Sequence, residues 1–198
     1  MTYLDALRSR RSNYDLTNKT SIPISELEDL LAQTLELSPT GFNSQSSRIV
    51  VLVEQKHQMF WNLVLAGIKK EIGDTPSFAK SQDKIANLRR SAGTILFYED
   101  ESVNDGLKEK FPLYAHNIGL WSEQSQGMLQ MSVWTLLANY GMGASLQHYS
   151  ELVATPLTQA LGLNPKWRLI GQMPFGVPAS IPQPKSKIPG RNRLVIAK

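Results

Sequence analysis

Asn43 and Gln45 are the residues whose side chains could recognise a ligand in most chemical detail. They lie in a polar, turn-forming segment, residues 38–48, which leads directly into the apolar and β-branched residues 49–53. Each side-chain amide presents a donor and an acceptor in one plane, which suits a heterocycle edge with alternating N–H and C=O groups. Polar loops at the start of buried strands are common binding sites for polar ligands. In the alternative interpretation, residues 38–48 form a connecting loop whose hydroxyls and amides cap its own turns.

Cationic side chains occur near both ends of the chain. Arg10 and Arg11 are followed by Ser12, and two guanidinium groups with a hydroxyl suit a phosphate. In the alternative, these arginines end the first helix and complement its dipole. Lys185 and Lys187 lie in a proline-rich segment close to the C-terminus.

Several other chemistries lack the residues that they need. The chain has no cysteine, and its three histidines stand far apart without the spacing of metal ligands, so we expect no metal site. Residues 143–147 fall one position short of a serine-nucleophile turn, and no Walker or dinucleotide motif occurs. We interpret the carboxylates of residues 99–101 as a solvated strand end. A site of amides, hydroxyls and cations therefore indicates an organic cofactor that carries a phosphate.

Length and charge exclude some functional classes. The 198 residues, 41% of them hydrophobic, fit one domain, residues 1–198, with a real core. The net charge of +4 comes from lysines and arginines that are spread along the chain, so local anion contacts explain it as well as nucleic acid does. No stretch resembles a signal peptide or a membrane span, and we expect a soluble, cytoplasmic protein.

Hydrophobic periodicity predicts an α+β fold with a central sheet wrapped by helices. A first helix begins at Thr2 with Asp5 as its capping partner, and Ser25 with Glu28 predicts a second capping box. Thr155 and Pro156 indicate the start of a late helix, which Gly162 ends. The other expected helices span 57–72, 78–90, 101–110 and 117–140, and the expected strands span 49–53, 92–98, 167–176 and 193–197. From about residue 178 to 198, prolines indicate an extended arm that lies across another body, such as a second subunit.

Three windows of the sequence resemble the FMN-dependent nitroreductase family, in its branch of fatty-acid-repression-mutant and copper-induced nitroreductases. Residues 10–14, RRSNY, resemble the N-terminal phosphate-binding motif of the family. Residues 38–48, SPTGFNSQSSR, resemble the loop at the isoalloxazine edge, and residues 184–189, PKSKIP, resemble the C-terminal P-K-S-R-L-P segment. Residues 93–100, GTILFYED, are also similar to this branch.

The resemblance implies a homodimer with FMN in a cleft between the subunits and the C-terminal arm embracing the partner. Arg10, Ser12, Lys185 and Lys187 would then hold the phosphate, with Arg11 beside them. One phosphate would explain the cations at both chain ends, which favours the phosphate interpretation over the helix-dipole one. Lys187 stands where the family more often has an arginine, so a two-pronged contact is lost while the charge is kept.

The resemblance also places residues around the flavin ring. Asn43 and Gln45 would meet its pyrimidine edge, with Ser46 nearby. Ser145, Leu146 and Gln147 would lie beside the ring, with the Gln147 backbone N–H near N5. Gln147-His148 replaces the usual glutamate–glycine pair of the family. Candidates for the substrate side are Phe42, Tyr114, Trp121 and His148.

We therefore expect a ping-pong oxidoreductase without a catalytic side chain. NAD(P)H would reduce FMN, and a small electron-poor acceptor such as a nitroaromatic or quinone would take two electrons in the same cleft. A flavin-binding regulatory or stress protein with little turnover needs the same pocket and stays open as an alternative. A nucleic-acid binder is supported only by the basic pI and ranks behind both.

Overall fold

A four-stranded antiparallel sheet forms the centre of the computed structural model, which describes residues 2–198. The strand order is β1-β2-β4-β3, with β1 (Ser47–Val53) at one edge and β3 (Gly143–Ala144) at the other. β2 (Gly93–Asp100) and β4 (Trp167–Gly176) lie between them, and every neighbouring pair is antiparallel. The α+β class and the central sheet predicted from the sequence are confirmed.

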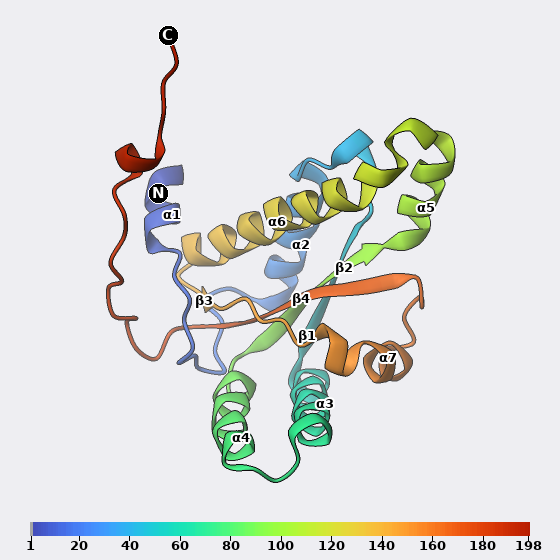
Figure 1. The fold of residues 1–198 in the computed structure, drawn as a ribbon. Helices are drawn as coiled ribbons and strands as arrows, with labels where there is room; N and C mark the ends of the chain where they lie inside the picture. Colours follow the sequence, from blue (N-terminus) through green and yellow to red (C-terminus); the bar gives the residue numbers. More distant parts are fainter. Residues whose placement is uncertain (1) are drawn as a thin grey trace.

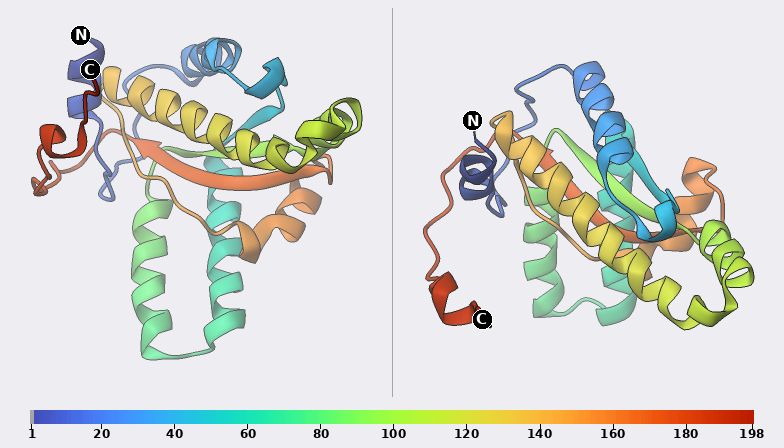
Figure 2. Two further views of the ribbon diagram at one scale, coloured as in Figure 1. Left: turned by 45° about the horizontal axis from the view of Figure 1, so that its top comes forward. Right: turned by 90° about the horizontal axis from the view of Figure 1, so that it is seen from above.

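Helices cover both faces of this sheet (Figure 1). α2 (Ile24–Leu37) and α6 (Ala115–Asn139) lie on one face, and α3 (Glu54–Ile72), α4 (Pro76–Arg89) and α7 (Ser150–Leu161) lie on the other (Figures 1 and 2). α5 (Glu101–Lys110) continues directly from β2, and α1 (Tyr3–Ser9) packs against α6. Short 3-10 turns span Gly41–Asn43, Pro112–Tyr114 and Gly190–Arg193.

Two apolar clusters, one on each face, bury the central strand β2. Ile95 and Phe97 belong to the cluster under α2 and α6, whereas Leu96 and Tyr98 belong to the cluster under α3, α4 and α7. Successive side chains of a strand point to opposite faces, so a strand that is covered on both faces is apolar throughout. The edge strand β1 was predicted to be buried, but Leu52 is the only one of its residues that is fully buried, and the others are partly exposed.

Some predicted helix ends are confirmed and others are wrong. Thr2 Oγ1 accepts a hydrogen bond from the Asp5 N–H at 3.2 Å, and the Asp5 carboxylate accepts one from the Thr2 N–H. Ser25 and Glu28 form no capping box, because α2 begins at Ile24 and Ser25 already lies inside its first turn.

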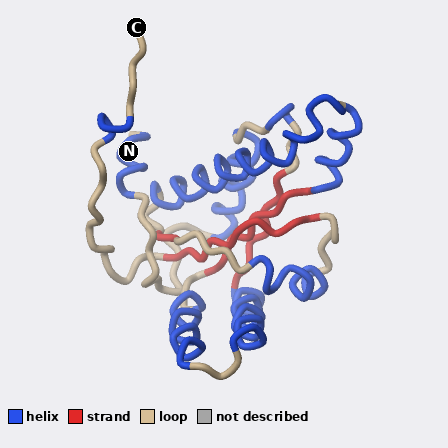
Figure 3. The backbone as a smooth tube through the Cα atoms, viewed as in Figure 1, coloured by secondary structure: helices blue, strands red, loops and turns tan. Residues whose placement is uncertain are grey.

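Two further predictions near the C-terminus are corrected. α7 begins at Ser150, five residues before Thr155, so Pro156 lies inside the helix. The extra turn contains Val153, which is fully buried in the cluster shared with α3, and this packing outweighs the local signal for a start at Thr155. The strand predicted for residues 193–197 is absent from the described chain, since Arg193 ends a 3-10 turn and residues 194–197 continue as an exposed loop (Figure 3).

The start of the C-terminal arm is attached to a segment near the N-terminus. The Thr17 N–H donates to the Val177 carbonyl at 2.9 Å, and the Val177 N–H donates to the Lys19 carbonyl at 2.8 Å. Gly176 permits this approach, because a Cβ at its position would lie 2.3 Å from the Thr17 carbonyl oxygen. The arm then leaves the sheet on the side of α1 (Figures 1 and 2), which brings both ends of the chain to the same side of the molecule.

Candidate functional site

Cations from both ends of the chain surround one cavity of about 570 Å³. Arg10, Arg11 and Ser12 line it from one side, and Lys185 and Lys187 line it from the arm. The Arg11 Nη2 donates to the Gln183 carbonyl at 2.7 Å, which fixes the arm beside the N-terminal motif. The folded chain thus brings together all five residues that the sequence assigned to a phosphate.

This cavity has little negative charge to balance its cations. Among residues 2–198, no carboxylate forms an ion pair with Arg10, Arg11, Lys185 or Lys187. Asp15 lines the same cavity, but its carboxylate already accepts hydrogen bonds from Arg90 at 3.4 Å and from Ser180 at 2.8 Å. Burial and the neighbouring charge of Arg11 lower the pKa of the Arg10 guanidinium. An anion such as phosphate would supply the missing charge.

The N-terminal motif is attached to strand β3. Ser12 forms a parallel bridge with Ala144, and the Asn13 N–H donates to the Ala144 carbonyl at 2.9 Å. A side chain at Gly143 would meet the Asn13 side chain at 2.8 Å, so this contact requires glycine. The cationic cavity is therefore held next to the segment that follows β3.

Residues 145–148 continue the sheet edge after β3. Their backbone N–H groups point alternately toward β4 and away from it, so only some of them pair within the sheet. The Gln147 N–H donates to the Gln172 carbonyl at 2.7 Å, and the Gln172 N–H donates to the Gln147 carbonyl at 2.9 Å. Ser145 and Gln147 are buried, and the Gln147 amide donates to the Ser145 hydroxyl at 3.1 Å. Leu146 and His148 point the other way, and their N–H groups have no partner in the described chain.

This pairing corrects one expectation from the sequence. The Gln147 N–H was expected to be the donor to a flavin N5, but it is used within the sheet. The N–H of the next residue, His148, is, with that of Leu146, one of the two neighbouring donors that have no partner within residues 2–198. The exposed His148 side chain also lines a larger cavity of about 1220 Å³ between α6, α7 and the start of β4.

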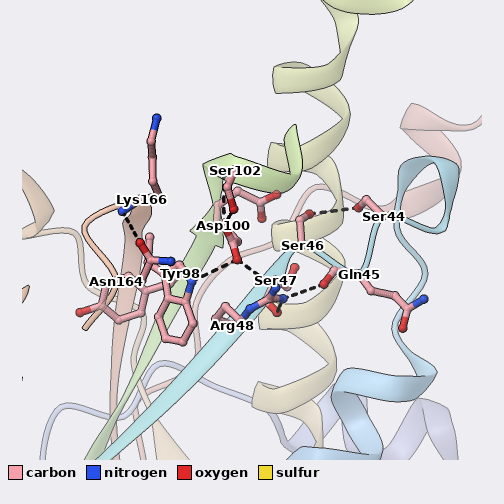
Figure 4. A network of polar contacts seen from close by, with 12 residues as sticks. Ser44, Gln45, Ser46, Ser47, Arg48, Tyr98, Asp100, Ser102, Asn164 and Lys166 are labelled. Carbon is pink, nitrogen blue, oxygen red and sulfur yellow. Dashed lines mark hydrogen bonds and ion pairs between the residues drawn. The ribbon is translucent and has the colours of Figure 1, made fainter. Parts of the chain in front are cut away.

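The loop with the two amides is held firmly while its amides stay free. The Gln45 N–H donates to Thr40 Oγ1 at 3.0 Å, and the Gly41 N–H donates to Ser125 Oγ on α6 at 3.3 Å. Phe42, Asn43 and Gln45 have positive φ values of 56°, 50° and 51°, a costly conformation for non-glycine residues that often occurs at functional sites. The Asn43 and Gln45 amides are exposed and have no hydrogen-bond partner within residues 2–198, and Figure 4 shows the Gln45 amide pointing away from its neighbours.

Beneath this loop lies a partly buried polar network (Figure 4). The Arg48 Nη1 donates to the Gln45 carbonyl at 2.7 Å, and its Nη2 donates to Asp100 Oδ2 at 3.0 Å. Trp167 Nε1 donates to the same oxygen at 3.1 Å. Ser46 is buried and its hydroxyl lies 3.0 Å from that of Ser44, so it supports the loop from inside.

The carboxylates at the end of β2 are buried, which corrects the expectation of a solvated strand end. Glu99 accepts hydrogen bonds from Asn104 at 3.1 Å and from Gln126 at 2.8 Å. Burial raises the pKa of Asp100, but the hydrogen bonds from Ser102 and Trp167 and the charge of Arg48 outweigh it and leave this pKa below its usual value. These carboxylates anchor the loop, and their full set of partners leaves no free group for proton transfer.

The cationic cavity and the amide loop lie at opposite ends of α6. The Arg10 guanidinium lies 4.5 Å from the Trp134 ring centroid, whereas the Phe42 ring lies 5.6 Å from that of Trp121. Trp121 and Trp134 are separated by about 20 Å along the helix axis at 1.5 Å per residue. A single chain therefore does not bring Arg10 to the same ligand edge as Asn43 and Gln45.

Comparison with known proteins identifies the family. The family model described as Nitroreductase family matches residues 7–177, which is most of the chain. The chain belongs to the nitroreductase family. Among residues 2–198, this nitroreductase has no group of three or more metal-binding side chains and no helix with the length and apolar character needed to cross a membrane.

Relatives of this nitroreductase confirm both its fold and the predicted branch. The nitroreductase FRM2 of Saccharomyces cerevisiae is 30% identical over 191 residues, which cover 94% of this chain and 93% of FRM2. The nitroreductase CinD of Lactococcus lactis, solved in complex with chloramphenicol, is 32% identical with a TM-score of 0.90, and the match covers 100% of both chains. A protein from Desulfovibrio desulfuricans, solved with FMN, shares the fold at 20% identity, with a TM-score of 0.71 over 100% of this chain and 98% of the other.

An aromatic cluster accompanies the amide loop of this nitroreductase. Phe42 stacks on Phe111 with a centroid distance of 4.6 Å and also contacts Tyr114 and Trp121. The sequence indicated Phe42, Tyr114 and Trp121 as candidates for the substrate side, but it did not indicate Phe111, which lies in an irregular link without periodicity. His148 follows β3, which lies at the edge of the sheet opposite to β1, and it is not part of this cluster.

Proposed function

We propose that this nitroreductase is an FMN-dependent NAD(P)H oxidoreductase that reduces nitroaromatic or quinone-like acceptors by two electrons and acts as a homodimer. The observation that supports this most strongly is the cavity where cations from both chain ends meet without ion-pair partners. CinD, a relative that matches the whole chain, has been solved with chloramphenicol and with 4-nitrophenol, both of which carry a nitroaryl group. Since NAD(P)H is an intracellular reductant, we place the protein in the cytoplasm.

The cationic cavity fits the phosphate of FMN. Arg10, Lys185 and Lys187 would neutralise the dianion, Ser12 would donate from its hydroxyl, and Arg11 would hold the arm through Gln183. Each charge-assisted contact of this kind contributes about 1.5–3 kcal/mol. The cavity is joined to β3 through the bridge between Ser12 and Ala144, so the flavin ring would lie against residues 145–148. There the free N–H of His148 would point at the ring.

The pyrimidine edge of the ring would be bound by the second subunit. Because the amide loop lies about 20 Å along α6 from Arg10, the partner subunit's Asn43 and the partner subunit's Gln45 are better placed to meet a ring that starts at the cationic cavity. Their unpaired amides and the strained, well-supported loop suit a rigid recognition surface. Each subunit would then contribute to two equivalent sites, as two-fold symmetry requires.

Exposed apolar residues at the C-terminus support the dimer. Leu194, Val195 and Ile196 are 64%, 89% and 72% exposed in the single chain, and no other segment of residues 2–198 covers them. The outer edge of β1 pairs with no strand of the described chain and offers free backbone N–H and C=O groups. We propose that residues 193–197 pair there with the partner, which would explain why their strand pattern produces no strand in one chain.

The FMN that these residues would hold would supply two-electron redox chemistry between NAD(P)H and the acceptor, with protons exchanged with solvent, and donor and acceptor would use the same site in turn. The contribution of the protein is to hold the ring, to place the His148 N–H against it and to present an aromatic surface. We assign no side-chain acid or base, because the carboxylates at the end of β2 are committed to Arg48, Asn104 and Gln126.

Two measurements test this function. The purified protein should show the visible absorption of an oxidised flavin, and it should oxidise NADH or NADPH in a steady state when a nitroaromatic acceptor is present. A yellow protein that does not turn over with any nitroaromatic or quinone would favour the alternative, a flavin-binding regulatory or stress protein. A colourless protein that does not bind added FMN would contradict both the oxidoreductase and the flavin-binding alternative.

A further inference from the structure

Trp134 lies directly beneath the cationic cavity without lining it. This residue of α6 packs against the apolar cluster that joins α2, α6 and the sheet, so its ring is held by the core. The Arg10 guanidinium carbon lies 4.5 Å from its ring centroid, well within the range of a cation–π contact. The Arg10 backbone is fixed as well, because its N–H caps α1 at the Ala6 carbonyl.

Arg10 has an unusual set of partners for a partly buried arginine. Its Nε is buried without a hydrogen-bond partner, and no carboxylate of residues 2–198 forms an ion pair with it. Arg48 offers a comparison, since it also lies over a tryptophan, Trp167 at 5.8 Å, but forms an ion pair with Asp100. Arg10 is therefore held over the ring by a cation–π contact, while its two Nη groups have no partner within residues 2–198 and stay available to a ligand.

We propose that Trp134 is a positioning residue for phosphate binding, which fixes the plane of Arg10 so that its N–H edge faces the ligand in the cationic cavity. This inference rests on the proposed function, because the ligand is the phosphate of FMN. Arginine has many rotamers in water, and a fixed guanidinium loses less conformational entropy when the phosphate binds. The ring face supports the cation without supplying a carboxylate that would compete with the phosphate.

The Trp134 N–H does not explain the position of this side chain. Its Nε1 is buried and has no partner in the described chain. The face of the ring, and not its N–H, is therefore the part that acts on Arg10. Phenylalanine at this position would keep a face and lose the N–H, whereas leucine would lose both.

The test compares FMN with riboflavin, which has the same ring but no phosphate. Dissociation constants for both are measured by flavin fluorescence on flavin-free full-length protein, for the wild type, Trp134→Phe and Trp134→Leu. We expect Trp134→Leu to weaken FMN about tenfold, which corresponds to about 1.4 kcal/mol. Riboflavin affinity should change less than about twofold, and Trp134→Phe should keep most of the FMN affinity.

A double-mutant cycle separates this role from a general packing role. In an Arg10→Ala background, Trp134→Leu should cause no further loss of FMN affinity, because its effect acts through Arg10. Circular dichroism melting checks that each variant is folded. Should Trp134→Leu fail to fold, Trp134→Met removes the ring with an unbranched side chain that adapts more easily to the space left behind.

Several outcomes would overturn the inference. Equal losses of FMN and riboflavin, an unchanged FMN affinity, or a full further loss in the Arg10→Ala background would each show that Trp134 acts only through packing. A wild type that binds FMN and riboflavin equally would overturn the phosphate cavity and this inference, but not the flavin site. A wild type that binds neither flavin would overturn the proposed function as well.

Discussion

Arg10 and Arg48 both lie over tryptophan rings, yet their surroundings give them different roles. Arg48 is neutralised by Asp100 and donates to the carbonyls of Gln45 and Ser47, so it supports the amide loop. Arg10 has no carboxylate partner within residues 2–198, and it lines an open cavity with three other cations. At the scale of single residues, the presence or absence of a carboxylate partner thus separates a structural cation from one that is available to a ligand.

Replacing Arg10 with alanine should remove most of the bound FMN. The loss of one charge-assisted contact of about 1.5–3 kcal/mol corresponds to a weakening of about 10- to 100-fold. The flavin content after dialysis, read from the visible spectrum, measures the effect, and Lys187→Ala should behave in the same way. Arg8→Ala is the matched control, since Arg8 is exposed on α1 and pairs with Asp5. Full occupancy in Arg10→Ala would contradict the assignment of the phosphate.

Replacing Asp100 with asparagine should destabilise the protein and weaken its response to acid. The pKa of Asp100 is lowered in the folded state, so it stabilises the protein above the unfolded pKa of about 3.9 and this contribution is lost as the pH falls further. Loss of the charge in its hydrogen bonds to Arg48 and Trp167 should cost about 1.5–3 kcal/mol at pH 7. Urea unfolding at pH 7 and at about pH 2.5, below the unfolded pKa, measures both effects. If the variant and the wild type lose equal stability between these pH values, Asp100 does not contribute to acid unfolding.

His57 connects three elements on the face of the sheet away from α6. Its Nδ1 lies 2.9 Å from Thr94 Oγ1 on β2, and its Nε2 lies 3.0 Å from the Arg89 carbonyl at the end of α4. Because a carbonyl only accepts, Nε2 donates, and Nδ1 accepts from the Thr94 hydroxyl. That hydroxyl in turn accepts from Trp61 Nε1 at 3.0 Å. At the scale of elements, a neutral histidine links α3 to β2 and α4.

Because the folded protein keeps His57 neutral, its free energy of unfolding should fall as the pH is lowered. Burial and the charge of Arg89 lower the pKa of His57, against the raising effect of its hydrogen bond to the Arg89 carbonyl. As the pH falls below the unfolded value of about 6.5, the unfolded chain binds a proton more readily than the folded one, and stability is lost. Between pH 7.5 and 5.5 this loss should reach at most about 1.4 kcal/mol.

Urea unfolding of His57→Gln at these two pH values checks this explanation. The variant should be less stable at pH 7.5 but should lose less stability on acidification than the wild type does. His116→Gln, a change at an exposed position on α6, should keep the dependence of the wild type. The same acid loss in His57→Gln and in the wild type would assign the effect to other groups.

At the scale of the whole molecule, the cationic cavity and the amide loop, which we propose to be two half-sites, lie far apart in one chain. The cationic cavity lies at the C-terminal end of α6 and the amide loop at its N-terminal end, about 20 Å apart along the axis. A rigid helix in the core does not shorten this distance, so a ligand that touches both half-sites needs a second copy of the chain.

Mixed dimers test this arrangement. Arg10→Ala damages only the cationic cavity, and the double change Asn43→Ala and Gln45→Ala damages only the amide loop. In a dimer with one chain of each kind, both defects fall in one site and the other site is intact. Such dimers, isolated with two different tags, should therefore retain about half of the wild-type FMN content, whereas either parent homodimer retains little. Mixed dimers as empty as their parents would show that both half-sites act within one chain.

Particular residues show where the sequence was sufficient. Thr2 with Asp5 and the left-handed Gly162 were predicted correctly, because each acts on its own turn of helix. Ser25 and Thr155 gave equally good local signals but were wrong: α2 already begins at Ile24, and the burial of Val153 against α3 extends α7 back to Ser150. Glu99 was misplaced for the same reason, since Asn104 and Gln126, which satisfy it, come from α5 and α6.

The sequence by itself determined which chemical groups the protein has for a ligand: cations near both ends, the side-chain amides of residues 43 and 45, and no thiol. Residue type is enough for this, because donors, acceptors and charges are properties of single side chains. The tertiary structure decided which of these groups are free. Pairing with β4 uses the Gln147 N–H and leaves that of His148, and the length of α6 separates Arg10 from Asn43. These outcomes depend on contacts between residues far apart in the chain, which no local pattern records.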